Sequence, residues 1–134
     1  MPAERLLLDT HTLIWWQAES DRLSATAASA IAVAERVWIS AISLWELATL
    51  IRLGRIELDR PVGRWATDLL AGHVSCIDVD PMVAVEAGSL VEFHGDPADR
   101  IIYATAQTHA MSLVTKDRVL TDRAAADGSV DVIW

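Results

Sequence analysis

The sequence has little of several features that mark specialised classes of protein. Cys76 is the single cysteine among 134 residues, so no disulfide can form within the chain. The longest uncharged stretches, such as 37–45, are much shorter than a membrane span. Glu4 and Asp9 interrupt the apolar region that a signal peptide needs. We therefore expect one cytoplasmic domain spanning 1–134, without repeats, linkers or membrane association.

Positive charge is also scarce. The chain has 11 Lys and Arg residues against 19 Asp and Glu residues, which gives a formal net charge of −8. Taken alone, this balance argues against a nucleic-acid substrate, because cationic contacts to phosphate supply most non-specific binding. Four basic side chains nevertheless cluster within a short segment: Arg52, Arg55, Arg60 and Arg64. The cluster fits a solvated helix end and loop as well as a rim that contacts phosphate.

Short apolar runs alternate with segments of helical spacing along the chain. The apolar runs predict strands at 5–8, 37–40, 74–79, 113–115 and 130–133. Helical spacing and capping residues predict helices at 10–18, 24–35, 43–53, 61–70, 81–93 and 97–109, with a short helical turn after Asp117. No hairpin signal separates the early strands, so we expect crossover connections and a mostly parallel sheet covered on both faces.

Four acidic residues stand just after predicted strands or at the start of the helices that follow them. They are Asp9, Glu46, Asp99 and Asp117. In an open parallel sheet these positions converge on the crevice at the carboxyl ends of the strands. Carboxylates that meet there repel one another unless a cation lies between them, and hard divalent ions such as Mg²⁺ or Mn²⁺ prefer oxygen ligands. The pattern therefore predicts a metal-dependent hydrolase of an anionic substrate.

Each acid also has a purely structural interpretation. Ser43 and Glu46 match a capping box, in which the Glu only bonds the backbone N–H of the cap. Asp99 fits the first turn of a capped helix, and Asp117 fits a surface turn. Asp9 is harder to explain in this way, because it lies between two apolar segments where an unpaired charge is costly. The joint pattern favours a site, since four unrelated caps would not all need to fall at one edge of the sheet.

The ordered motifs resemble a known family. These are Leu-Leu-Leu-Asp-Thr-His at 6–11, Ser-x-Trp-Glu at 43–46, His-Gly-Asp-Pro-Ala-Asp-Arg at 94–100 and Leu-Val-Thr-Lys-Asp at 113–117. They look like the PIN-domain nucleases, specifically the VapC-type toxins of bacterial toxin–antitoxin modules, over essentially the whole chain. The resemblance implies a three-layer α/β/α fold and Mg²⁺- or Mn²⁺-dependent endoribonuclease activity. It also implies a homodimer and neutralisation by a small antitoxin protein.

The resemblance assigns the acidic quartet of the family to this chain. The implied catalytic and metal-binding residues are Asp9, Glu46, Asp99 and Asp117. Secondary candidates are Asp96, Thr10 and Thr115, and candidates for RNA contact are Arg52, Arg55, Arg100 and Lys116. His11 and His94 are interpreted as turn or packing residues, because an all-oxygen metal site does not need imidazole.

Two other classes of function compete with this hypothesis. A receiver-type phosphoacceptor domain shares the length, the acidic pocket and a Lys after a late strand, but 37–40 ends without the Asp that would be phosphorylated. A catalytically idle PIN-like module would bind RNA or protein without cleaving it. The sequence also leaves open whether Trp15 and Trp16 belong to the core or to an interface, since adjacent residues of one helix cannot both point inward.

Overall fold

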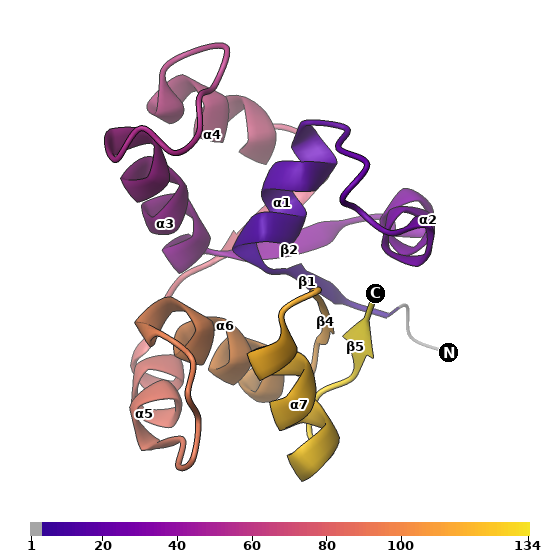
Figure 1. The fold of residues 1–134 in the computed structure, drawn as a ribbon, viewed down its shortest axis with the longest axis vertical. Coiled ribbons are helices and arrows are strands. Elements are labelled where there is room, and N and C mark those ends of the chain that lie inside the picture. The colour runs from indigo at the N-terminus through magenta and orange to yellow at the C-terminus, as the bar shows by residue number, and fades with distance from the viewer. Residues whose placement is uncertain (1–3) are drawn as a thin grey trace.

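The computed structural model describes residues 4–134 as strands that alternate with helices (Figure 1). The strands are β1 (Leu6–Leu8), β2 (Val37–Ser40), β3 (Val74–Ile77), β4 (Ser112–Val114) and β5 (Val132–Ile133). The helices are α1 (Thr10–Gln17), α2 (Ala25–Val33), α3 (Ala41–Arg52), α4 (Val62–Leu70), α5 (Pro81–Ser89), α6 (Pro97–Thr108) and α7 (Arg118–Asp127). Between residues 4 and 134, no helix is both long and apolar enough to cross a membrane.

All the strands of the sheet run parallel, in the order β3-β2-β1-β4-β5. The central strand β1 places Leu8 opposite Ile39 of β2 on one side and opposite Val114 of β4 on the other. Parallel neighbours need crossover connections, and the intervening helices supply them. Because β1, β2 and β4 end at the same edge, the residues that follow them are brought close together in space.

The side chains of β1 divide between two cores. Leu6 and Leu8 pack on one face of the sheet in a cluster that includes residues of α1, α2, α3 and α4. Leu7 points to the other face and packs with residues of α6 and α7. This alternation is expected for a strand, and it makes the run of three leucines apolar on both sides. Figure 1 shows the two groups of helices on opposite sides of the sheet, which confirms the three-layer α/β/α fold.

Acidic and hydroxyl side chains begin most of the helices. Asp9, Ser24, Asp80, Asp96 and Asp117 each accept a hydrogen bond from the backbone N–H three residues further on. Each bond satisfies one of the N–H groups that a helix leaves unpaired at its start. Three of these caps are also predicted site acids, so capping and a possible chemical role coincide in the same side chains.

The helix that carries Glu46 begins earlier than the sequence predicted. Its cap is Ser40, whose hydroxyl accepts a hydrogen bond from the N–H of Ile42 at 3.2 Å. The predicted cap, Ser43, is instead the buried third residue of α3, within its first turn. Both serines are suitable caps, but β2 ends at Ser40 and Ala41 is a good helix former, so α3 starts directly after the strand.

Other element boundaries also differ from the predictions. The short helical turn expected after Asp117 is instead the ten-residue helix α7, which ends at Gly128 with a left-handed φ of 69°. Its composition is polar, so the helical pattern is weak in the sequence. Its apolar face is narrow and consists of Leu120 and Ala124, which lie one turn apart and pack in the same core as Leu7. Strand β3 and helix α5 are shorter than predicted by two and about four residues, respectively.

Candidate active site

The four predicted acids come from four elements that meet at the carboxyl edge of the sheet. Asp9 directly follows β1, and Asp117 follows β4 after two intervening residues. Glu46 lies in the second turn of α3, and Asp99 lies in the first turn of α6. Helices α3 and α6 contact each other, which brings their acids toward the ends of the strands.

Asp9 is the most buried of the four acids, with an exposed fraction of 6%. Its Oδ1 accepts a hydrogen bond from the N–H of Thr12 at 2.8 Å, and its Oδ2 accepts one from the hydroxyl of Thr115. The backbone N–H of Asp9 donates to the carbonyl of Val114 at 3.2 Å. These contacts hold the carboxylate between β1 and β4 and satisfy a charge that burial would otherwise disfavour.

Asp117 is linked to Asp9 through one threonine. The hydroxyl oxygen of Thr115 accepts a hydrogen bond from the N–H of Asp117 at 3.0 Å while its proton goes to Asp9. Asp117 Oδ1 accepts from the N–H of Leu120 at 3.0 Å, so this acid also caps α7. Thr115 therefore supports two of the acids at once.

Glu46 is held by a hydroxyl from α1. The Thr10 hydroxyl donates to Glu46 Oε1 at 2.5 Å and lies 2.9 Å from Ser43 Oγ. Because a hydroxyl has a single proton, Glu46 Oε1 and Ser43 Oγ are alternative acceptors for the Thr10 hydroxyl. Glu46 is the sixth residue of α3 and Ser43 is not its cap, so the capping-box interpretation of this acid is wrong. Burial raises the pKa of Glu46; the Thr10 hydrogen bond opposes the increase, and the charges of Asp96 and Asp9 add to it.

The carboxylate of Asp99 is the least satisfied of the four. Among residues 4–134, no hydrogen-bond donor contacts it. Burial raises the pKa of Asp99 to about 7, and the nearby charges of Asp96, Asp117, Glu46 and Asp9 contribute to the increase. The pKa shift indicates that all these carboxylates lie within electrostatic reach of Asp99. A strongly perturbed acid in such a setting is typical of a functional site.

The turn before α6 positions Asp99. Asp96 Oδ1 accepts a hydrogen bond from the N–H of Asp99 at 2.8 Å, so Asp96 is a helix cap beside the site. Gly95 leaves no room for a side chain, because an added Cβ would lie 2.9 Å from the Cβ of Asp99 and would collide with the ring of Phe93. The Gly-Asp turn therefore packs directly against the base of the Asp99 side chain.

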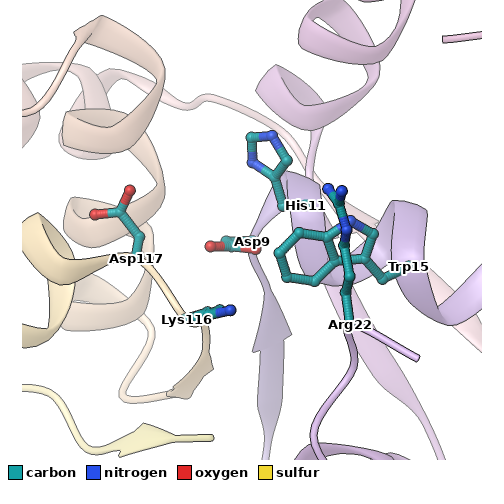
Figure 2. Close-up of a pocket in the computed structure, with 6 residues that line it drawn as sticks. All are labelled: Asp9, His11, Trp15, Arg22, Lys116 and Asp117. Carbon is teal, nitrogen blue, oxygen red and sulfur yellow. The ribbon is translucent and has the colours of Figure 1, made fainter. Parts of the chain in front are cut away.

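An open cleft of about 440 Å³ lies against Asp9 and Asp117. Its lining is completed by an imidazole, an indole and two cationic side chains, namely His11, Trp15, Arg22 and Lys116. Figure 2 shows Asp9 between Asp117 on one side and Trp15 with Arg22 on the other. Sequence reasoning did not assign His11, Trp15 or Arg22 to the site. The available signal was spacing, since His11 and Trp15 lie one turn apart on the helix that Asp9 caps.

The predicted RNA-contact residues have different environments. Lys116 is exposed and lines the cleft. Arg52 and Arg55 are exposed at the end of α3 and just beyond it. Of the other clustered arginines, Arg60 pairs with Asp59 and Asp68, and Arg64 also pairs with Asp68.

Arg100 does not fit its predicted role in RNA contact. Its guanidinium donates to the carbonyl oxygens of Ala87 at 2.9 Å, Gly88 at 3.3 Å, Leu90 at 2.6 Å and Phe93 at 3.2 Å. It also lies 5.6 Å from the centre of the Phe93 ring. The side chain therefore ties the end of α5 and the following loop to α6, where it holds the segment that carries Asp99.

The two adjacent tryptophans have different neighbours. Trp16 packs against the core on the α1 side of the sheet. The ring of Trp15 lies 5.8 Å from that of Trp134 and 5.7 Å from that of His11, measured between ring centres. Trp15 is therefore part of the cleft. Neither of these two indoles is as exposed as that of Trp45, whose exposed fraction is 61%.

The acids fit a hard divalent cation in their chemistry. They offer carboxylate oxygens, and a cation would relieve the repulsion that contributes to the raised pKa of Asp99. In the described part of the chain, no three acidic, histidine or cysteine side chains already stand in ligating geometry. Asp9 and Asp117 instead bond helix N–H groups, but each of their oxygens keeps a further lone pair.

Comparison with known proteins identifies the family. The PIN domain model matches residues 6–126, and the chain therefore belongs to the PIN-domain family rather than to the receiver-type class. A curated relative, Ribonuclease VapC22 of Mycobacterium tuberculosis, is 49% identical over 116 residues, which cover 86% of this chain and 88% of the relative. The resemblance to VapC-type PIN domains that the sequence motifs indicated is confirmed.

Solved structures agree with this assignment. A toxin-antitoxin complex from Klebsiella pneumoniae superposes with a TM-score of 0.65 at 25% identity, over 93% of this chain and 94% of that one. A DNA-bound VapBC from Salmonella typhimurium superposes with a TM-score of 0.68 over 97% of each chain. Its identity is 19%, so this second similarity supports the fold alone.

Proposed function

We propose that the chain is a Mg²⁺- or Mn²⁺-dependent endoribonuclease and the toxin of a toxin–antitoxin module. The observation that carries the proposal is the convergence of Asp9, Glu46, Asp99 and Asp117 at one edge of the sheet, close enough for their charges to raise the pKa of Asp99. Acids placed to repel one another reduce stability, and this arrangement is expected where a cation-dependent function requires it.

The relatives support both the activity and the biological role. Ribonuclease VapC22 is named for RNA cleavage and covers most of this chain. The Klebsiella pneumoniae structure is a toxin-antitoxin complex. By analogy, we infer that RNA is the substrate, that a small antitoxin protein is the partner and that the protein acts in the cytoplasm. We also expect a homodimer, for which light scattering should report about twice the 14.7 kDa mass of the chain.

In this proposal the residues of the site divide between binding and support. Asp9 and Asp99 would hold the principal ion, while Glu46 and Asp117 would hold a second ion or act through water. When bound, the divalent ion supplies an activated water and neutralises charge at the scissile phosphate. The Thr115 hydroxyl keeps the Asp9 carboxylate oriented, and the Thr10 hydroxyl does the same for Glu46. The lysine that lines the cleft, Lys116, supplies positive charge for the phosphate backbone.

Cleavage of a mixed RNA substrate tests the proposal. Wild-type protein with Mg²⁺ or Mn²⁺ should cleave the RNA, excess EDTA should abolish cleavage, and added metal should restore it. Asp131→Asn is a suitable control, because Asp131 is exposed and precedes β5, at the opposite edge of the sheet. Cleavage that continues undiminished in EDTA would rule out the metal-dependent mechanism. A folded, metal-loaded protein that cleaves no RNA would instead support the idle binding module.

A further inference from the structure

The wall of the cleft on the side opposite Asp117 is aromatic. Trp15 lines the cleft, and its ring centre lies 5.7 Å from that of His11 and 5.8 Å from that of Trp134. The ring planes of Trp15 and Trp134 are tilted by 59°, an arrangement in which one indole supports the other without covering both of its faces. Trp15 is half-buried, so part of its ring is anchored and part is open to the cleft.

Two cationic side chains complete the same cleft. Arg22 and Lys116 are both exposed and both line it. Among residues 4–134, neither forms an ion pair with a carboxylate, although Arg60, Arg64 and Arg123 do. The chain as a whole has a net charge of −8, so these two cationic side chains beside an indole are a local exception to the negative overall charge. The cleft volume of about 440 Å³ lies in the range of about 300–1,000 Å³ that is typical of small-ligand pockets.

We propose that this cleft binds one unpaired nucleotide beside the bond to be cleaved, with its base stacked on Trp15 and its phosphate near Arg22 and Lys116. Aromatic faces stack with any base, and lysine and arginine contact phosphate without regard to sequence. The acids Asp9 and Asp117 border the same cleft, so a nucleotide held there would place its backbone beside the carboxylates.

This inference rests on the proposed function and assigns a base contact within that site to Trp15. The bases of a duplex are stacked on one another and cannot also stack on a side chain, whereas the bases of loops, bulges and ends can. A base contact at Trp15 therefore requires an unstacked base next to the cleavage point. His11 and Trp134 have a supporting role, because they hold the indole of Trp15 in place.

A binding experiment that separates base from phosphate tests the subsite. The protein carries Asp99→Asn to keep the RNA intact, Mg²⁺ is present, and binding is followed by fluorescence anisotropy. One probe is a short labelled single-stranded RNA, and the other has the same backbone with stable abasic spacers. The parent should bind the base-bearing probe at least about fivefold more tightly, which is the lower end of what a stacked base contributes. Trp15→Leu should bring this ratio close to one, and Trp15→Phe should retain most of it.

Two controls make the result specific. Lys116→Gln should weaken binding of both probes by a similar factor, because it removes a phosphate contact alone. Trp45→Ala removes an exposed indole outside the cleft and should leave the ratio unchanged. Thermal melting confirms that each variant is folded. If folded Trp15→Leu keeps the preference of the parent, or if the parent binds neither probe or shows no preference, the subsite is wrong. The outcome is independent of the proposed activity, since absence of RNA cleavage by the wild type leaves the binding ratio measurable.

Discussion

Two aspartates, Asp99 in the first turn of α6 and Asp127 at the end of α7, experience opposite environments. Asp127 accepts hydrogen bonds at 2.8 Å from the Tyr103 hydroxyl and from the N–H and hydroxyl of Ser129, and one at 3.0 Å from Arg123 Nε. Burial alone would raise its pKa, but these donors outweigh it and lower the pKa to about 2. Burial and neighbouring acids raise the pKa of Asp99 to about 7.

The ionised carboxylate of Asp127 stabilises the fold, whereas that of Asp99 destabilises it. The donors around Asp127 connect α6, α7 and the turn before β5, so its charged form strengthens the native structure. The charged form of Asp99 weakens the native structure, because no donor in the described residues compensates for its neighbours. A protein that keeps such an acid gains something other than stability from it.

Removing the charge of Asp99 should have the largest effect. We expect Asp99→Asn to reduce metal-dependent RNA cleavage by at least about 100-fold, the upper end of what the loss of a group around a metal costs. Without metal, the melting temperature should stay equal or rise, because repulsion is relieved. Cleavage rates and thermal melts in EDTA measure the two effects. Cleavage near the wild-type rate would remove Asp99 from the site.

The equivalent change at Asp127 should have the opposite pattern. Asp127→Asn keeps the shape of the side chain but weakens hydrogen bonds to a charged acceptor, and we expect the free energy of unfolding to fall by about 1–2 kcal/mol. Cleavage per folded molecule should be unchanged. Urea unfolding at neutral pH and a cleavage assay corrected for folded protein test the contrast. Loss of cleavage without loss of stability would contradict the structural role.

A pair of arginine variants sharpens the comparison. Arg100→Lys keeps the charge but cannot reproduce the fork that binds four carbonyls beside Asp99, so cleavage should fall by about tenfold. Arg123→Lys is the matched control, because Arg123 also lies over Phe93 and binds Asp127 and the carbonyl of Val91. It should lower the melting temperature without reducing cleavage per folded molecule. Equal effects of the two variants on cleavage would show that Arg100 does not position the site.

The smallest effect concerns pH. The folded-state pKa of Asp99 lies above its ordinary value of 3.8, so the folded protein binds more protons and loses stability as pH rises from about 4 to 7. The pKa of Asp127 is lowered, so its contribution is present above about pH 4 and is lost as pH falls toward 2. In metal-free protein, the difference in melting temperature between Asp99→Asn and wild type should therefore grow from pH 4 to 7. A constant difference would contradict the raised pKa.

Much of the fold and part of the site could be predicted from local patterns. The run of three leucines before Asp9 indicated a strand buried on both faces, and its side chains do divide between two cores. The start of α3 was predicted incorrectly because Ser40 and Ser43 are equally good caps locally, and only the end of β2 selects between them. The role of Arg100 was missed for a similar reason, since the four carbonyls that it binds belong to α5 and the loop after it.

The sequence by itself determined the family and the alternation of strands and helices, and it predicted the four acids of the candidate site, because each of these depends on residue type and spacing along the chain. The tertiary structure decided how the acids are supported. The threonine hydroxyls on Asp9 and Glu46 and the charges around Asp99 come from residues far apart in sequence. It also placed Trp15 and Arg22 beside the acids. Burial and electrostatic repulsion depend on distances in space, and those distances exist only once the parallel strands have brought their carboxyl ends to one edge.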